Sequence, residues 1–188
     1  MTRIDIQNLL LLLATKPRVG MRVVLDLGIQ GRVLVQLAAL VSVLTGIMGF
    51  VVTLIAPVAE GVVAPTPIGY VIVAASNIVL STILFYWAGR TVEGTGTLQD
   101  IAMAMIAHQG FMMLLPLIIA LASTISPTLS GMTLLIGLPY LLYLMAGFLA
   151  EAHKLRSTGM AFLLIVGVLF VLSLVLIFFV SLFGIVPA

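Results

Sequence analysis

Long apolar runs separated by short polar stretches dominate this sequence of 188 residues. A helix that crosses the hydrocarbon core of a bilayer needs about 20 mostly apolar residues. Five segments meet that requirement and are predicted to be spanning helices: residues 33–56, 68–88, 98–124, 129–150 and 159–183. The pattern therefore predicts an all-α protein, a polytopic membrane bundle of five transmembrane helices.

The composition excludes a soluble domain. Hydrophobic residues make up 63% of the chain and charged residues 7%, whereas a soluble domain carries about 25% charged residues. The absence of cysteine excludes disulfides and thiolate metal sites, and two histidines are too few for the usual protein zinc site. No basic surface or motif for nucleic acid is present. We therefore expect no cofactor, no metal and no nucleic-acid partner.

The cations predict the orientation in the membrane. Five precede the first span, one follows the second and two follow the fourth: Arg3, Lys16, Arg18, Arg22, Arg32, Arg90, Lys154 and Arg156. With five spans, all eight lie on one face, which the positive-inside rule makes cytoplasmic. The N-terminus is then expected in the cytoplasm and the C-terminus on the outer side of the membrane.

The stretch before the first span has a different pattern. Pro17 suits a first helical turn, and Arg18, Arg22 and Asp26 recur every four residues on one face. This segment is too short to span, so it is interpreted as an amphipathic interfacial helix with its apolar side in the headgroup boundary and its arginines toward phosphates. Residues 4–14 form a second interfacial element or a short re-entrant piece.

These patterns divide the chain into an interfacial segment, residues 1–32, and a transmembrane domain, residues 33–188. Gly28 and Gly31 allow the chain to turn from the first part into the membrane.

Glu151, His153, Lys154 and Arg156 stand close together between the fourth and fifth spans. The predicted topology makes this stretch a cytoplasmic turn whose cations orient the neighbouring helices. We expect Glu151 and His153 to act neither as acid or base nor as ligands. Ser157 and Thr158 suit the N-cap of the fifth helix. Contact with anionic lipids or a partner is expected from the basic residues on this face: Arg18, Arg22, Arg32, Arg90, Lys154 and Arg156.

A few polar residues and prolines fall inside the spans. Ionisable or polar groups at membrane depth suggest function, although packing or headgroup contact is the commoner explanation. The polar candidates are Gln36, Asn77, His108 and Gln109. Pro116 and Pro139 can kink the third and fourth spans, as in transporters with broken helices. Ser130 lacks a nearby base, which argues against an intramembrane hydrolase.

Three stretches together resemble the Yip1-domain family: "TKPRVGMRVVLDLG", "GRTVEGTGTLQDIAMAMIAHQGFMMLLPLI" and "FLAEAHKLRSTGMAFLLIVG". The resemblance, closest to bacterial members, implies a five-helix membrane bundle with a cytoplasmic N-terminus. It also implies a place in the inner membrane of a bacterium, with the C-terminus in the periplasm. The small-GTPase role of eukaryotic members belongs to long N-terminal regions and is not expected here.

We expect a membrane protein that is not an enzyme and that acts as a scaffold, an accessory subunit or a membrane-organising element. Its expected partners are anionic lipids and either another membrane protein or further copies of itself. The alternative is a small channel or transporter that uses the proline-containing third and fourth spans. A transporter would enclose a polar cavity that reaches mid-membrane, whereas a scaffold would have a dry, closed core.

Overall fold

The computed structural model describes residues 5–56 and 65–182. Within these ranges the regular structure is entirely helical. The helices are α1 (Ile6–Thr15), α2 (Pro17–Asp26), α3 (Gly31–Ile55), α4 (Pro67–Arg90), α5 (Leu98–Met112), α6 (Leu114–Ile125), α7 (Pro127–Ala152) and α8 (Thr158–Leu182). The predicted all-α class is thus confirmed.

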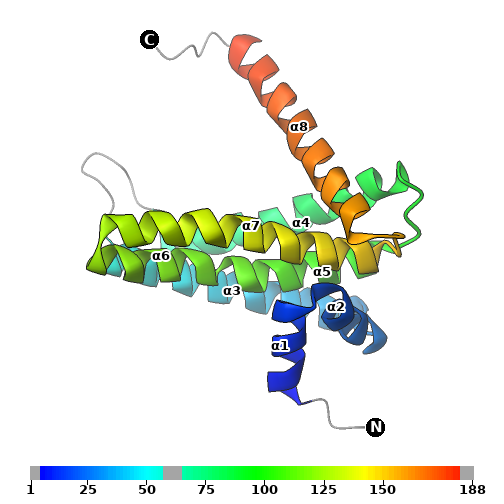
Figure 1. The fold of residues 1–188 in the computed structure, drawn as a ribbon, viewed down its shortest axis with the longest axis horizontal. Coiled ribbons are helices and arrows are strands. Elements are labelled where there is room, and N and C mark those ends of the chain that lie inside the picture. Colours follow the sequence, from blue (N-terminus) through cyan, green and yellow to red (C-terminus); the bar gives the residue numbers. More distant parts are fainter. Residues whose placement is uncertain (1–4, 57–64, 183–188) are drawn as a thin grey trace.

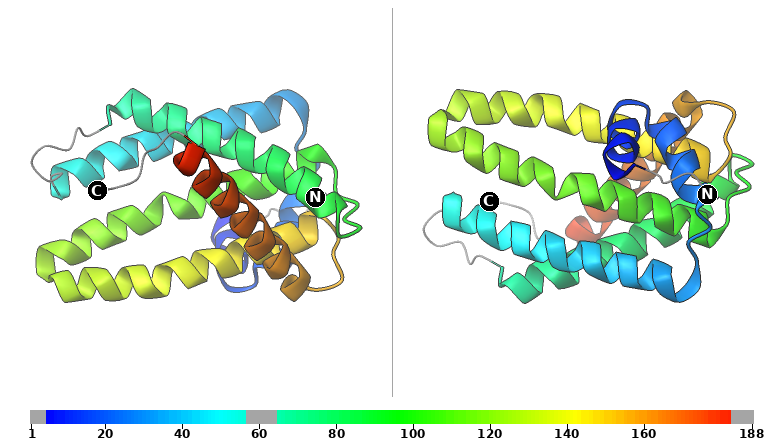
Figure 2. Two further views of the ribbon diagram at one scale, coloured as in Figure 1. Left: turned by 90° about the horizontal axis from the view of Figure 1, so that it is seen from above. Right: turned by 90° about the horizontal axis from the view of Figure 1, so that it is seen from below.

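Four spanning segments lie alongside one another, and the fifth diverges from them. The α3–α4 hairpin packs against a second hairpin in which α5 and α6 run one way and α7 returns (Figures 1 and 2). Helix α8 leaves the end of α7 at a steep angle, and α1 projects away from the bundle on the opposite side (Figure 1). Five segments are long and apolar enough to cross a membrane, α5 and α6 counting as one, as the sequence predicts.

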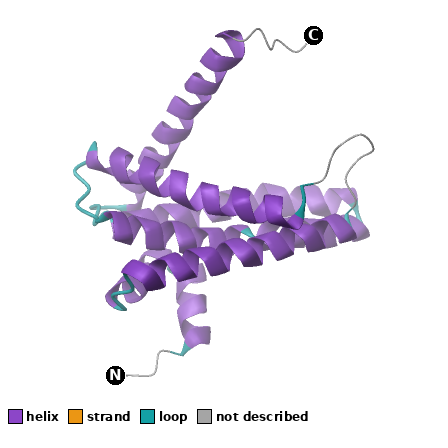
Figure 3. Ribbon diagram, turned by 180° about the vertical axis from the view of Figure 1, so that it is seen from behind, coloured by secondary structure: helices purple, strands orange, loops and turns teal. Residues whose placement is uncertain are grey.

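Short polar motifs set where the long helices begin. The Thr66 hydroxyl accepts from the amide of Gly69, and Pro67 fills the first helical position of α4. Thr97 and Asp100 form a reciprocal capping box at the start of α5. These caps lie at the helix ends, beside the loops and turns that join the helices (Figure 3).

The two prolines inside the spans behave differently. The third span is divided at Met113, which precedes Pro116 by three residues and separates α5 from α6. Proline cannot donate a helical hydrogen bond and its ring crowds the preceding turn, which accounts for the break. Helix α7 continues through Pro139 without a division.

The surroundings of α2 differ from the sequence expectation. Pro17, Gly20, Met21 and Val24 are buried, and α2 packs against α7. Part of the segment that the sequence places in the headgroup boundary is thus covered by protein, on a helix more than a hundred residues away. Val19 and Leu27 remain 46% and 44% exposed, and contact of this part with the headgroup boundary stays a prediction. Gly28 and Gly31 have positive φ angles of 63° and 57°, as the turn from α2 into α3 requires.

The core is concentrated at one end of the bundle. Its largest fully buried side chains include Phe148, Met21, Ile101, Leu144 and His153. At this end α2, the start of α3, the α4–α5 loop and the α7–α8 turn meet (Figure 1). We call it the basic end, because Arg18, Arg22, Arg32, Arg90, Lys154 and Arg156 all belong to these segments.

Candidate functional site at the basic end

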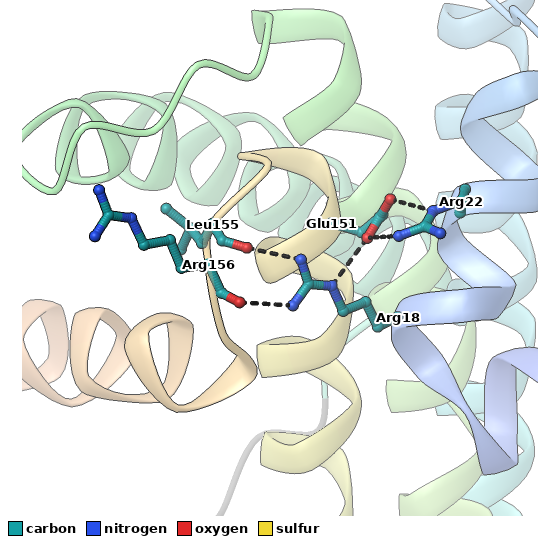
Figure 4. A network of polar contacts seen from close by, with 5 residues as sticks. All are labelled: Arg18, Arg22, Glu151, Leu155 and Arg156. Atoms are coloured by element: carbon teal, nitrogen blue, oxygen red, sulfur yellow. Dashed lines mark hydrogen bonds and ion pairs between the residues drawn. The ribbon is translucent and has the colours of Figure 1, made fainter.

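One carboxylate joins α2 to the end of α7. Arg18 donates from Nε to Glu151 Oε2 at 3.0 Å, and Arg22 donates from Nε to Oε1 at 2.6 Å (Figure 4). A second nitrogen of Arg22 reaches Oε2 at 3.1 Å. The Glu151 side chain is only 13% exposed, against 33% for Arg18 and 59% for Arg22. Two guanidinium groups therefore hold one largely buried carboxylate and dock α2 on the bundle.

The turn after α7 supplies further acceptors to the same arginine. Lys154 has a positive φ of 57°, and the amide of Leu155 returns to the carbonyl of Ala150 at 2.8 Å. This left-handed turn ends α7 and turns the next carbonyls toward α2. Arg18 donates to the carbonyls of Leu155, at 2.7 Å, and Arg156, at 3.4 Å (Figure 4). Arg18 thus binds both the end of α7 and the turn that follows it.

His153 is the most enclosed polar side chain at the basic end, with no exposed surface. Its ring lies against Gly89 and Gly94, where a β carbon would overlap the imidazole. Its Nε2 lies 2.9 Å from the carbonyl oxygen of Phe85. Because a carbonyl only accepts, Nε2 carries the proton in the neutral ring, and Nδ1 has no partner among the described residues. We call this arrangement the histidine cage.

The α4–α5 loop closes around the cage. The amide of Thr95 donates to the carbonyl of His153 at 3.0 Å. Arg90 donates to the carbonyls of Gly94 and Gly96 and lies over the Tyr86 ring, 5.0 Å from its centroid. Burial lowers the pKa of His153 below its ordinary 6.5, because a low-dielectric setting disfavours the imidazolium ion. The ring is therefore neutral near pH 7.

Two tyrosines extend the contact along α7. The hydroxyl of Tyr140 donates to the carbonyl of Ala14 at 3.0 Å, and that of Tyr143 donates to the carbonyl of Thr15 at 3.4 Å. These carbonyls end α1 and have no helical partner of their own. The corner between α1 and α2 is thus attached to the bundle by neutral hydrogen bonds as well as by the ion pairs.

The sequence groups Glu151 and His153 with the cations of a cytoplasmic turn, but in the structure both side chains are largely or fully buried. The glutamate is a largely buried ion-pair partner and the histidine is a core residue. Neither role has a local signal, because the partners lie on α2 and α4. The glycines at 89, 94 and 96 are the one hint in the sequence, since a cluster of small residues permits close approach of a ring. The Ser157 hydroxyl accepts from the amide of Met160, which confirms the predicted N-cap.

The remaining predicted basic residues face outward. Arg32, Lys154 and Arg156 have exposed side chains, and none of the three is in an ion pair within the described ranges. Arg18 and Arg22 have an internal partner that the sequence does not reveal. Contact of any of these residues with anionic lipids stays a prediction.

The intramembrane polar residues do not gather at one point. Gln36 is exposed on α3, and Gln109 is buried on α5 in a small pocket with Thr45 and Tyr70. Asn77 and His108 line a larger groove of about 690 Å³ between α4, α5, α7 and α8. Apart from Asn77, Ser81 and His108, the lining is largely aliphatic, aromatic and methionine side chains. A continuous row of polar groups from one end of the bundle to the other is not found in the described part of the chain.

The arrangement is that of an all-helical membrane bundle closed at one end where Glu151 of α7 binds Arg18 and Arg22 of α2. We call this set of three residues the Glu151 clamp. A family model described as the Yip1 domain matches residues 11–180. The chain belongs to the Yip1 family. The matched range includes the second half of α1, all of α2 and nearly all of α8, so the Glu151 ion pairs and the histidine cage both lie within the Yip1 domain. Neither the curated proteins nor the solved structures contain a match to this chain.

Membership confirms the resemblance seen in the three sequence stretches. It also supports a multi-pass membrane protein, in agreement with the five long apolar segments. Within the described residues, no group of three or more histidine, aspartate or glutamate side chains is placed to hold a metal ion.

Proposed function

We propose that this Yip1-family protein is a non-catalytic membrane scaffold that presents lipid-facing helices to a partner while its basic end is held rigid. The observation that carries the proposal is the contrast between the two parts of the molecule. The basic end is closed by the ion pairs of Glu151 and by the histidine cage, whereas α8 is largely exposed beyond its buried first turns, which end at Ile165.

The exposed surface of α8 supports a docking role. Its outer turns include Phe170, Leu174, Phe178 and other large apolar side chains that are about half exposed or more. Without a driving force from water, membrane helices associate through packing and hydrogen bonds, so an unpacked helix is available to a partner helix. An accessory subunit or an organiser of the membrane would use such a surface.

The alternative of a channel or transporter has weaker support. The groove that holds Asn77 and His108 is the best candidate for a solute site, but its lining is mostly apolar and it lies beside α8 at the bundle surface. A polar substrate would lose its hydration there without enough polar groups to replace it.

The proposed orientation places the basic end in the cytoplasm. A reporter active only in the cytoplasm should be active when inserted between Lys154 and Arg156, and inactive when fused after Ala188. The reason is that cations near span ends are retained on the inner side. Activity of both fusions would contradict a five-span topology, as would inactivity of both.

The scaffold proposal predicts no solute flux and a defined assembly. Purified protein in liposomes should pass potassium ions and protons no faster than protein-free liposomes, and His108→Asn should leave that leak unchanged. Extraction in mild detergent should yield a particle larger than one chain with its micelle, of constant composition across preparations. A flux that His108→Asn abolishes would favour the transporter.

A further inference from the structure

Asn77 presents an amide to the membrane interior. It lies in the middle of α4, about 15 Å from one end of the helix and about 20 Å from the other at 1.5 Å per residue. Its side chain is exposed and makes no hydrogen bond to any described residue. At this depth no water or headgroup is within reach of a short side chain, and an unpaired amide in hydrocarbon is costly. No described residue supplies a partner for this amide, which points to a partner from beyond the described part of the chain.

The residues around Asn77 form a stripe suited to helix packing. Val73, Asn77, Leu80, Leu84 and Trp87 alternate in steps of four and three along α4, which is the heptad spacing of packed helix pairs. Val73, Leu80 and Trp87 are 65%, 66% and 67% exposed. We call these five residues the α4 stripe. It is an apolar seam with one polar position near its middle.

The stripe borders an open groove. Asn77, Leu80, Leu84 and Trp87 form one wall of the 690 Å³ groove, and residues of α8 including Ile165, Leu169 and Leu172 form part of the other. Helix α8 diverges from α4 and meets it only near the basic end (Figures 1 and 2). Because α8 does not cover the stripe, a helix from outside can reach Asn77.

We infer that the occupant is a second copy of this chain, packed α4 against α4 with Asn77 facing Asn77 across a two-fold axis along the membrane normal. An amide both donates and accepts, so two copies of Asn77 satisfy each other, whereas a lipid acyl chain offers no polar atom. Two copies inserted in the same orientation place Asn77 at the same depth, as an isologous contact requires. A single asparagine in a heptad seam also fixes register and oligomeric state.

This inference rests on the proposed scaffold role and names the partner of its α4 face. The chain has no cysteine, so each engineered thiol is unique. Single cysteines at 73, 80 and 84, which leave Asn77 in place, should form disulfide-linked dimers in native membranes under mild copper–phenanthroline oxidation. Val35→Cys is the matched control, since Val35 is 67% exposed on α3 and away from the stripe. Dimers at the stripe positions should exceed those at Val35→Cys severalfold.

The amide itself is tested in the Leu80→Cys background. Asn77→Leu should lower the rate of dimer formation roughly three- to tenfold, as expected for loss of an interhelical polar pair, while Asn77→Gln keeps an amide and should lose less. Helical content by circular dichroism checks that both variants fold. Equal cross-linking at positions 80 and 35, or an unchanged rate in Asn77→Leu, would overturn the inference.

The result can also separate this inference from the scaffold proposal. If the stripe cysteines cross-link only to a different protein, the two-copy interface is wrong and the scaffold role stands. If the chain is monomeric in membranes and migrates alone in mild detergent, both are wrong.

Discussion

Gly89→Ala is expected to lower the free energy of unfolding by about 2 kcal/mol or more, as overpacking of a fixed core does. The new methyl group would overlap the imidazole ring of His153. That ring has no exposed surface and is held at the Phe85 carbonyl, so it cannot move aside. Thermal or denaturant unfolding in mild detergent, followed by helical circular dichroism, measures the effect.

The test is made specific by removing the ring. In a His153→Ala background, Gly89→Ala should be neutral or stabilising by up to about 1 kcal/mol, because alanine is the better helix former. The coupling between the two positions is then read from a double-mutant cycle. Gly110→Ala is the matched control, since a β carbon there meets nothing within 4 Å. Equal effects of Gly89→Ala and Gly110→Ala in the wild-type background would contradict the cage.

Glu151→Ala is expected to release α2 from the bundle. Removal of the carboxylate leaves Arg18 and Arg22 close together without their common partner. The partial exposure of both arginines puts the expected loss at the low end for broken ion pairs, about 1–2 kcal/mol. That loss corresponds to a roughly 5- to 30-fold larger open population.

Thiol labelling can follow the release. Met21 is fully buried on the side of α2 that faces the bundle, so the single cysteine of Met21→Cys should react slowly with a maleimide. Glu151→Ala should raise that rate roughly 5- to 30-fold, in step with the larger open population. Val19→Cys, at a position 46% exposed on the same helix, sets the rate for an accessible thiol. Arg32→Ala is the control for loss of a nearby charge, because Arg32 makes no ion pair among the described residues. If the maleimide reacts with Met21→Cys at the same rate in the Glu151→Ala and Arg32→Ala backgrounds, the clamp does not hold α2.

The residues around the end of α7 show what a local sequence pattern cannot reveal. Glu151 and His153 lie beside Lys154 and Arg156, and by their neighbours alone all four belong to one polar turn. The structure separates them, because α7 ends at Ala152 and the left-handed Lys154 reverses the chain. Two of the four side chains then point inward and two outward. A reversal of this kind depends on contacts with α2 and α4, which no local pattern contains.

The amphipathic pattern of α2 gives a second case. The spacing of Arg18 and Arg22 correctly predicts one polar face, and both arginines do share a partner. The same spacing cannot tell whether the apolar face meets lipid or protein, since both solvents are equally apolar. Met21 is fully buried against the bundle, which shows that this part of the face meets protein.

The sequence by itself determined the number, type and approximate bounds of the spanning helices, because the bilayer requires long apolar runs with satisfied backbone groups. It also predicted the capped start of the fifth span at Ser157 or Thr158, because such a cap depends on residues within one turn. Only the tertiary structure decided that Glu151 meets Arg18, that His153 fills the space left by Gly89, and that α8 leaves α4 uncovered. The physical reason is that inside a membrane the hydrophobic effect no longer selects which helix faces meet, so the choice falls to packing and hydrogen bonds between distant residues.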